Sequence, residues 1–351
     1  MSEKTMQALV KTAKGKGQVK LQEVPVPKIG PREVLIEIKA AGICGTDLHI
    51  CRDEFPSWPP VILGHEFAGV IAEVGREVGD WKIGDRVVGE PHTLACGTCW
   101  LCRTGNHQLC SSKRSPGWGI DGCFAKFMRF PDPGLLHRLP EDLDFEQAAL
   151  VEPAANVVHD VLERSRVEPG DIAAVVGPGP IGLLSALAAK ASGAAAVVVL
   201  GTDSDEERRL PIARKISSLD HVWNVQKENA VSLMMDLTKG RGADLVVEAS
   251  GDESGIALGL ELVRKMGRFA AIGLTGKQKI YFPYDTGMSK ALNFFFNLST
   301  SHTSWDKAIR LVQANKSEVK LLITHQGPLE RWEEFFTALE LKKGVKGIFI
   351  P

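Results

Sequence analysis

The 351-residue sequence lacks an excess of charge of either sign. Its 42 Lys and Arg residues are balanced by 43 Asp and Glu residues, which leaves a formal net charge of −1. Proteins that bind nucleic acid through its phosphates need a basic surface, so this balance excludes nucleic acid as an expected partner. With 44% hydrophobic residues the chain has enough apolar surface to bury, which excludes a disordered protein.

Long hydrophobic runs are also lacking. The N-terminal segment MSEKTMQALVKTAKGKG has no apolar core of the kind found in a signal peptide. The most apolar stretch, residues 181–201, contains Lys190 and is broken at Gly193 before a β-branched half. This pattern predicts a helix followed by a buried strand rather than a membrane span. We therefore expect a cytoplasmic protein with no membrane partner.

Cysteines are few, and they are clustered. There are seven, an odd number that does not suggest a disulfide framework in a chain without a signal peptide. Four of them have the spacing C-x2-C-x2-C-x7-C, at Cys96, Cys99, Cys102 and Cys110. Four thiolates on one loop can close the coordination shell of a Zn²⁺ ion, so this cluster predicts a structural zinc site. An iron–sulfur motif would continue with Cys-Pro, whereas Ser111 follows Cys110.

Two patterns of secondary structure follow each other along the chain. The first part has short alternating segments such as residues 33–44 and 67–75, separated by frequent Pro and Gly turns. This is typical of an antiparallel, barrel-type domain. After about residue 155, apolar strands at 171–176 and 195–200 alternate with helical segments at 181–192 and 205–216. The fold class is therefore expected to be α/β, with a doubly wound parallel sheet in the second part.

A glycine-rich motif lies between the first strand and first helix of that second part. Gly177, Gly179 and Gly182 fit G-x-G-x-x-G, and Pro180 and Ile181 complete the motif at the start of the helix. In a dinucleotide site the first glycine permits the tight turn, the second lets the pyrophosphate approach the backbone, and the third permits close packing. The motif in this context predicts a nicotinamide dinucleotide site.

The end of the second strand departs from the pattern usual for NAD. An acidic residue normally ends this strand and binds the ribose, but here Gly201 and Thr202 precede Asp203. Thr202 or Asp203 could bind the ribose hydroxyls of NAD, or Arg208 or Arg209 could bind the 2′-phosphate of NADP. We expect NAD rather than NADP.

A second group of metal-ligand types lies near the N-terminus. Cys44 and the pair His65-Glu66 are about twenty residues apart, each next to a predicted strand end. Cys, His and carboxylate ligands with one open position make a catalytic zinc site. Each residue alone also has an ordinary explanation as a small buried side chain, a structural histidine or a surface charge.

The motifs Cys44-Gly-Thr-Asp, Gly64-His-Glu-Phe-Ala-Gly and Gly84-Asp-Arg-Val, with the four-cysteine loop, carry a family resemblance. The sequence resembles the zinc-containing medium-chain alcohol dehydrogenases, in their polyol (sorbitol/iditol) and threonine dehydrogenase branches. The resemblance implies a catalytic zinc held by Cys44, His65 and Glu66. It places Glu152 as a further carboxylate near the metal, and it leaves open whether Glu66 or Glu152 is the ligand.

The resemblance also implies a proton relay through Thr46 and His49 and places His92 near the substrate. It implies a GroES-like catalytic domain at 1–155, a Rossmann domain at 156–295, and a return segment at 296–351. Two zinc ions per chain and a homo-oligomer, expected to be a tetramer, follow from it. The expected reaction is oxidation of a secondary alcohol of a polyol to a ketone, with hydride transfer to the nicotinamide. The alternatives are activity like that of L-threonine 3-dehydrogenase, or a non-enzymatic dinucleotide-binding protein.

Overall fold

Strands from both ends of the chain form the first half of the molecule, here called the antiparallel half because every strand pair in it is antiparallel except β15 with β16. The computed structural model of the protein describes residues 4–351. A small sheet has the order β2-β1-β4, and a larger one has the order β15-β16-β3-β5-β6-β8, with β7 also paired to β3. These strands are β1 (Thr5–Lys11), β2 (Val19–Pro25), β3 (Val34–Gly42), β4 (Val61–Ile62), β5 (Glu66–Val74), β6 (Arg86–Gly89), β7 (Phe127–Phe130), β8 (Leu136–Arg138), β15 (Ile323–Gly327) and β16 (Lys346–Phe349).

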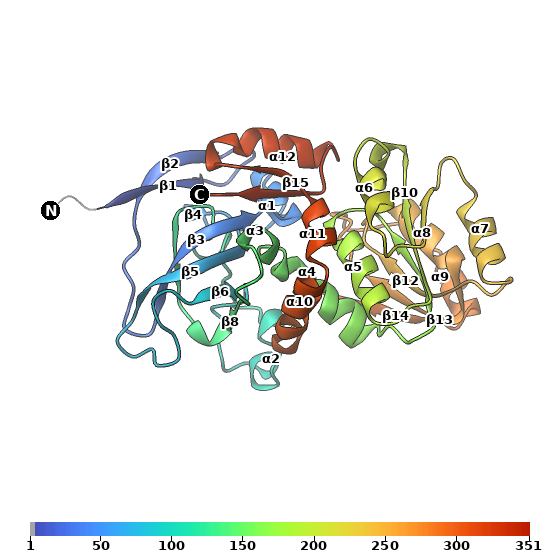
Figure 1. Cartoon of the computed structure of the whole chain (residues 1–351), viewed down its shortest axis with the longest axis horizontal. Helices are drawn as coiled ribbons and strands as arrows, with labels where there is room; N and C mark the ends of the chain where they lie inside the picture. Colours follow the sequence, from blue (N-terminus) through green and yellow to red (C-terminus); the bar gives the residue numbers. More distant parts are fainter. Residues whose placement is uncertain (1–3) are drawn as a thin grey trace.

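The alternation seen in the sequence accounts for the central strand of the larger sheet. Val34, Ile36 and Ile38 of β3 are buried, and β3 pairs antiparallel with β5, β7 and β16. The pairing with β16 brings the C-terminal strand beside a strand that lies some 300 residues earlier. Figure 1 shows β1, near the start of the described residues, and the C-terminus in this half of the molecule.

The second half is a six-stranded, fully parallel sheet. Its order is β11-β10-β9-β12-β13-β14, the doubly wound arrangement in which chain order reverses between β9 and β12. The strands are β9 (Ile172–Val176), β10 (Ala196–Gly201), β11 (His221–Asn224), β12 (Ala243–Glu248), β13 (Val263–Ala271) and β14 (Asn293–Phe296). The predicted α/β fold class is thereby confirmed.

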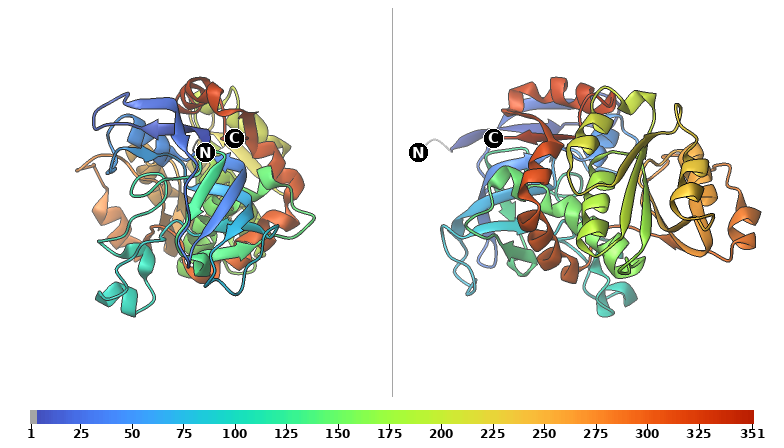
Figure 2. Two further views of the ribbon diagram at one scale, coloured as in Figure 1. Left: turned by 90° about the vertical axis from the view of Figure 1, so that its left-hand side faces the viewer. Right: turned by 45° about the vertical axis from the view of Figure 1, so that its right-hand side comes forward.

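Helices lie on both sides of this parallel sheet (Figure 2). They are α5 (Pro180–Ala191), α6 (Arg209–Lys215), α7 (Ala230–Leu237), α8 (Glu253–Leu262) and α9 (Tyr284–Ser289). The helix predicted at 205–216 was wrong at its start. Residues 203–205 form a 3-10 turn, η4, in which Asp205 accepts a hydrogen bond from the N–H of Thr202, and α6 begins only at Arg209.

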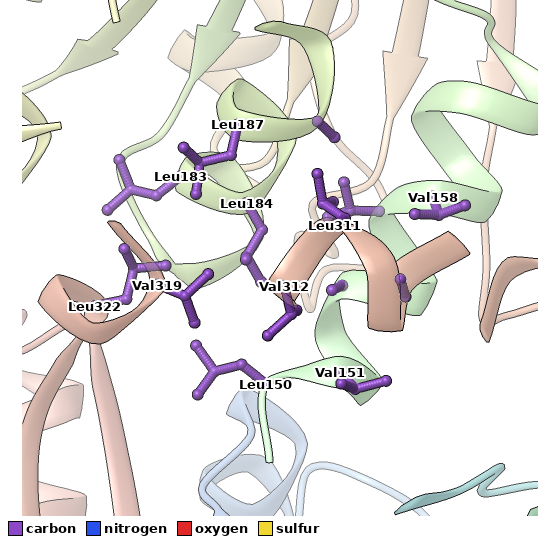
Figure 3. Packing of buried hydrophobic residues seen from close by; sticks show 14 of the residues in the cluster. Leu150, Val151, Val158, Leu183, Leu184, Leu187, Leu311, Val312, Val319 and Leu322 are labelled. Atoms are coloured by element: carbon purple, nitrogen blue, oxygen red, sulfur yellow. The ribbon is translucent and has the colours of Figure 1, made fainter. Parts of the chain in front are cut away.

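Four helical segments join the two halves. These are α4 (Val151–Val157), the π-helical turn η3 (Val158–Arg164), α10 (His302–Ala314) and α11 (Lys316–Leu322). Leu150 and Val151 at the start of α4, Leu184 of α5 and Val312 of α10 meet in one fully buried cluster (Figure 3). A continuous apolar core therefore links the antiparallel half to the parallel sheet.

The remaining helices lie in the antiparallel half. They are α1 (Gly45–Cys51), α2 (Trp100–Arg103), α3 (Phe145–Ala148) and α12 (Trp332–Glu340). Within residues 4–351, no helix combines the length and the apolar character that crossing a bilayer requires. The expected division of the chain at residues 155 and 295 stays a prediction.

Candidate metal centres and dinucleotide cleft

The four-cysteine loop gathers its thiols around one point. Cys96 and Cys102 have their sulfur atoms 3.9 Å apart, and Cys99 and Cys110 have theirs 4.0 Å apart. A tetrahedron with Zn–S bonds of about 2.3 Å has edges of about 3.8 Å, so these spacings fit a zinc ion. The short helix α2 and the 3-10 turn η1 (His107–Leu109) place the last three thiols.

Backbone N–H groups point at these sulfur atoms. The N–H of Cys99 donates to Cys96 Sγ at 3.4 Å, and the N–H of Cys96 donates to Cys110 Sγ at 3.5 Å. Hydrogen bonds from the backbone of Thr98 and Cys99 lower the pKa of the Cys96 thiol to about 6. Because thiolates are the form that binds zinc, these backbone hydrogen bonds favour the metal-binding form of Cys96.

The second group lies where three elements meet. Cys44 precedes α1, His65 precedes β5, and Glu66 is the first residue of β5. One potential ligand atom from each of these residues lies within 4.8 Å of those of the other two. His65 and Glu66 are buried. The structure thus brings together the three residues that the sequence predicted as zinc ligands.

Asp47 and Trp118 contact this group and were not singled out from the sequence. Asp47 is fully buried, accepts hydrogen bonds from the N–H groups of Cys44 (2.9 Å) and Gly64 (3.2 Å), and has Oδ1 3.9 Å from His65 Nδ1. The Trp118 ring meets the His65 ring edge-on at a centroid distance of 5.2 Å. Asp47 belongs to the Cys-Gly-Thr-Asp motif, which was an available signal, whereas nothing near Trp118 in the sequence marks it.

Lys346 is the least expected member of the group. It lies on β16, is buried, forms an ion pair with Glu66 Oε2, and donates to the carbonyl oxygen of Ile43 at 2.9 Å. Burial would lower the pKa of Lys346, but Glu66 and Cys44 outweigh it and raise the pKa. Gly42 makes room for this pair, since a Cβ there would overlap Glu66 Oε2.

Glu152 adds another buried carboxylate. It lies in the first turn of α4, and its Oε1 accepts a hydrogen bond of 3.0 Å from Asn156 Nδ2. Burial, partly offset by His65 and reinforced by Glu66, raises the pKa of Glu152 to about 7.

The whole group carries surplus negative charge. Burial would lower the pKa of His65, but Cys44, Asp47 and Glu152 outweigh it and raise the pKa to about 10. Among the described residues, the buried His65 Nδ1 has no hydrogen-bond partner, and Glu66 Oε2 is paired only with the Lys346 ammonium group. A cluster that retains a proton so strongly is one that favours a cation, so the residues present fit a divalent metal.

The predicted relay residues lie one helical turn apart on α1. Thr46 and His49 are both half-buried, and His49 Nδ1 lies 2.9 Å from Glu54 Oε2 and 3.0 Å from an Arg52 nitrogen. His92 is buried, with its Nε2 2.6 Å from Glu90 Oε2. The two cysteines without a predicted role differ in setting: Cys123 is buried and donates to the Glu66 carbonyl oxygen at 3.5 Å, whereas Cys51 is half-buried.

The glycine motif adopts the predicted turn. Gly177 has φ of 104°, which is the left-handed region, and a Cβ on Gly182 would overlap the carbonyl oxygen of Gly177. A Cβ on Gly179 would have no atom of the protein within 4 Å, so this residue faces open space in front of α5. Pro180 is the first residue of α5 and Ile181 the second. An anion at this point would meet the N-terminus of the helix.

A cleft of about 890 Å³ lies in front of this turn. Its walls are the glycine turn, the residues after β10 and the loop after β12, and its polar lining includes Thr202, Asp203, Asp205, Arg209 and Lys342. Of the two arginines named from the sequence, Arg209 lines the cleft, while Arg208 is exposed and is not part of its lining. Lys342, from the C-terminal segment, donates to Ser204 Oγ at 3.1 Å and was missed because it is distant in the sequence.

Comparisons with known proteins identify the family. Residues 30–141 match the model of the alcohol dehydrogenase GroES-like domain, and residues 180–314 match that of the zinc-binding dehydrogenases. A sorbitol dehydrogenase of Halalkalibacterium halodurans is 35% identical over 346 residues, covering 99% of each chain. An L-threonine 3-dehydrogenase of Pyrococcus horikoshii is 38% identical over 360 residues, covering 100% of this chain and 99% of the relative.

Solved structures agree with this. A zinc-binding dehydrogenase from Sinorhizobium meliloti, bound to NADP, superimposes with a TM-score of 0.90 at 26% identity, covering 99% of this chain and 100% of that one. These comparisons confirm the family resemblance inferred from the motifs and the two-domain fold class. They also confirm that the protein is an enzyme, so the alternative of a non-enzymatic dinucleotide-binding protein is not supported. The chain therefore belongs to the zinc-binding alcohol dehydrogenases, enzymes with a GroES-like domain and a nicotinamide-dinucleotide-binding Rossmann domain.

Proposed function

We propose that this enzyme oxidises a secondary alcohol of a polyol to a ketone and transfers the hydride to a nicotinamide cofactor. The observation that carries the proposal is the grouping of Cys44, His65 and Glu66, with the Glu152 carboxylate beside them. Cys44 and His65 would hold a catalytic zinc together with Glu66 or Glu152. Cys96, Cys99, Cys102 and Cys110 would hold a structural zinc, which makes two per chain.

Zinc bound by Cys44, His65 and one of the two carboxylates would supply a Lewis acid that favours the deprotonated alcohol. The chain's own residues provide the surroundings. Asp47 lies beside the His65 ring and holds the backbone of Cys44 and Gly64, which fixes two ligands relative to each other. Thr46 and His49 are proposed to carry the proton outward, since His49 stands between Glu54 and Arg52 near the surface.

The helix α4 supports the coupling of the two sites. Glu152 is in its first turn, and the same helix packs against α5, whose N-terminus faces the dinucleotide cleft. Both sites therefore depend on one rigid helix in the shared core (Figure 3). Such support holds a reacting carbon and a nicotinamide ring at a fixed separation.

A polyol is favoured over threonine on charge. Asp47, Glu66 and Glu152 are three buried carboxylates with one buried ammonium group, that of Lys346, close by. A neutral polyol offers hydroxyl donors to such a group. The threonine zwitterion brings an ammonium group that these carboxylates would attract, but its carboxylate would need a cationic partner, and the ammonium group of Lys346 is already paired with Glu66. The threonine alternative is kept because of the buried His92 and of relatives named L-threonine 3-dehydrogenase.

For the cofactor we propose NAD in preference to NADP. Asp203 and Asp205 lie in the turn after β10, where the adenosine ribose binds in this fold. Arg209 already has Nη1 3.7 Å from Asp205 and donates to the Gly344 carbonyl, so it is not free to bind a 2′-phosphate. Equal or better kcat/KM with NADP would contradict this choice.

We propose a homo-oligomer, a tetramer in its full form. Seven of the fourteen exposed large hydrophobic side chains of the described residues lie between Met266 and Leu298, at the β14 edge of the parallel sheet. Phe296, on that edge strand, is 76% exposed. An apolar patch beside an open strand edge fits association with another copy. Light scattering after size-exclusion chromatography tests the state, and a monomer at micromolar concentration would contradict it.

A reducing compartment, the cytoplasm, is proposed from the thiols. All seven cysteines are unpaired, and four of them are arranged for a metal rather than for disulfides.

The decisive experiment is a substrate screen with a matched variant. Purified enzyme is assayed with polyols, simple secondary alcohols and L-threonine, each with NAD and with NADP. We expect the highest kcat/KM with a polyol and NAD. The Cys44→Ala variant should lose turnover, retain dinucleotide binding and contain about one zinc per chain instead of two. Retained turnover in this variant, or a clear preference for threonine, would overturn the proposal.

A further inference from the structure

A third group of metal-ligand side chains lies outside both zinc centres. Glu90 follows β6, His137 is in β8, and His302 is the first residue of α10. One ligand atom from each lies within 4.8 Å of those of the other two, as for the two groups already described. None of the three is a cysteine, and none belongs to a motif singled out from the sequence.

The three side chains meet at one carboxylate oxygen. Glu90 Oε1 is 3.0 Å from His137 Nε2 and 2.6 Å from His302 Nδ1. Glu90 is fully buried and His137 is buried, whereas the His302 side chain is 69% exposed. The inner side of the group is therefore buried, and its outer side, at His302, is open to solvent. An ion and a water ligand can enter from this outer side.

Outer partners already orient one of these side chains, that of His137. Asp306 Oδ1 lies 3.5 Å from His137 Nδ1, the ring nitrogen that faces away from Glu90. The His137 ring also stacks on the buried Trp305 ring, at a centroid distance of 5.3 Å and an angle of 10°. A carboxylate behind a histidine is the usual outer support of a metal-bound imidazole, since it fixes the ring and strengthens the donor nitrogen.

The second oxygen of Glu90 faces another histidine, His92. Glu90 Oε2 has no hydrogen bond of acceptable geometry among the described residues, although His92 Nε2 lies 2.6 Å from it. His92 thus contacts one oxygen of the carboxylate, while His137 and His302 contact the other.

We propose that Glu90, His137 and His302 form a third metal site, of two imidazoles and one carboxylate, for Zn²⁺ or a similar divalent transition ion. Two histidines, one carboxylate and a water make an open zinc site. Ligand atoms around zinc at about 2.0–2.1 Å are about 3.3 Å apart in a tetrahedron. Glu90 Oε1 lies 2.6 and 3.0 Å from the two ring nitrogens, so each nitrogen must move away from this oxygen by less than 1 Å to reach that spacing. His302, exposed at the end of a helix, has room to do so.

The site would join parts of the chain that are distant in sequence. Glu90 and His137 lie in the antiparallel half, while His302 and Asp306 lie on α10, where the chain returns from the parallel sheet. An ion here adds a link between the two and stabilises the folded state by mass action.

The experiment uses the purified enzyme with its tightly bound metals in place, so its readout does not depend on the substrate proposal. Zn²⁺ and, separately, Co²⁺ are titrated by calorimetry into wild type and two variants with exposed changes, His302→Ala and Asp306→Asn. The matched control is His221→Ala, since His221 belongs to none of the three groups. Each protein is also checked by its melting temperature with and without the ion.

We expect wild type and His221→Ala to bind one further equivalent, with a rise in melting temperature. His302→Ala should lose this equivalent, and Asp306→Asn should bind it about 10- to 100-fold more weakly. Added Co²⁺ should show visible bands of a four- or five-coordinate ion without a thiolate charge-transfer band. No further equivalent in wild type, an undiminished one in His302→Ala, or unchanged affinity in Asp306→Asn would each overturn the proposal. The last result would indicate a single surface histidine instead of a built site.

Discussion

Removal of the ammonium group of Lys346 is the sharpest test of how charge is balanced around Cys44, His65 and Glu66. Lys346 and Glu66 are both buried with about 2% of their side chains exposed, and they form an ion pair. Lys346→Met removes the charge at similar length and leaves Glu66 buried without its partner. Breaking a buried pair in this way costs about 3–5 kcal/mol.

The cost converts into a melting temperature. For 351 residues at about 2.1 cal/mol/K each, the unfolding entropy is about 0.7 kcal/mol/K, which makes the expected loss about 4–7 °C in the metal-free protein. The double variant Lys346→Met/Glu66→Gln replaces the pair by two neutral side chains and should recover most of the loss. Scanning calorimetry of metal-free and zinc-loaded protein measures both.

The zinc-loaded form then separates the two candidate carboxylates. If Glu66 binds the metal, zinc compensates its charge, and Lys346→Met lowers the melting temperature by less in the zinc-loaded protein than in the metal-free protein. If Glu152 is the ligand, the loss stays the same with zinc bound. The ion-pair reasoning would be refuted if Lys346→Met lowered the free energy of unfolding by less than about 1 kcal/mol. It would also be refuted if the double variant lost as much stability as the single one.

Three other predictions concern separate parts of the molecule. Gly179→Ala should weaken dinucleotide binding and leave the melting temperature unchanged, because its Cβ enters open space in the cleft. Gly182→Ala should also lower the melting temperature, because its Cβ overlaps the Gly177 carbonyl oxygen. Equal effects of the two variants in calorimetry and in cofactor titration would contradict this. Cys102→Ser should reduce bound zinc by one per chain, measured by elemental analysis, while dinucleotide binding persists, and unchanged zinc would exclude the four-thiolate site. Burial raises the pKa of Asp160 to about 8, above its unfolded value. This side chain therefore contributes stability below about pH 4 that is lost as the pH rises to 8. Asp160→Asn should remove that decline in melting temperature with pH, and an unaltered dependence of melting temperature on pH would count against it.

Local patterns in the sequence were enough for most elements and for the first members of each site. Alternation predicted β3, and the glycine spacing between an apolar strand and a helix predicted the turn of Gly177 to Gly182. The four-cysteine loop could be identified because its ligands are close in sequence and need only a short turn to converge. Such features depend on backbone conformation and side-chain chemistry over a few residues.

Helix boundaries were less predictable where a side chain competes with the helix. The capping interaction of Asp205 with Thr202 turns residues 203–205 into a 3-10 segment and delays α6 to Arg209. That delay leaves Arg208 exposed and places Arg209 in the cleft lining. The residue at which α6 begins thus decides which of the two adjacent arginines lines the cleft.

The sequence by itself determined the family, the two kinds of domain, the thiolate loop, the dinucleotide turn and the identity of Cys44, His65 and Glu66 as candidate ligands. Only the tertiary structure decided what surrounds them. Lys346 reaches Glu66 because β16 pairs with β3, and His302 reaches Glu90 because α10 packs back on the antiparallel half. These contacts join residues more than 200 positions apart, and no local pattern marks them. They arise from strand pairing and from burial of the shared apolar core, which the chain satisfies only as a whole.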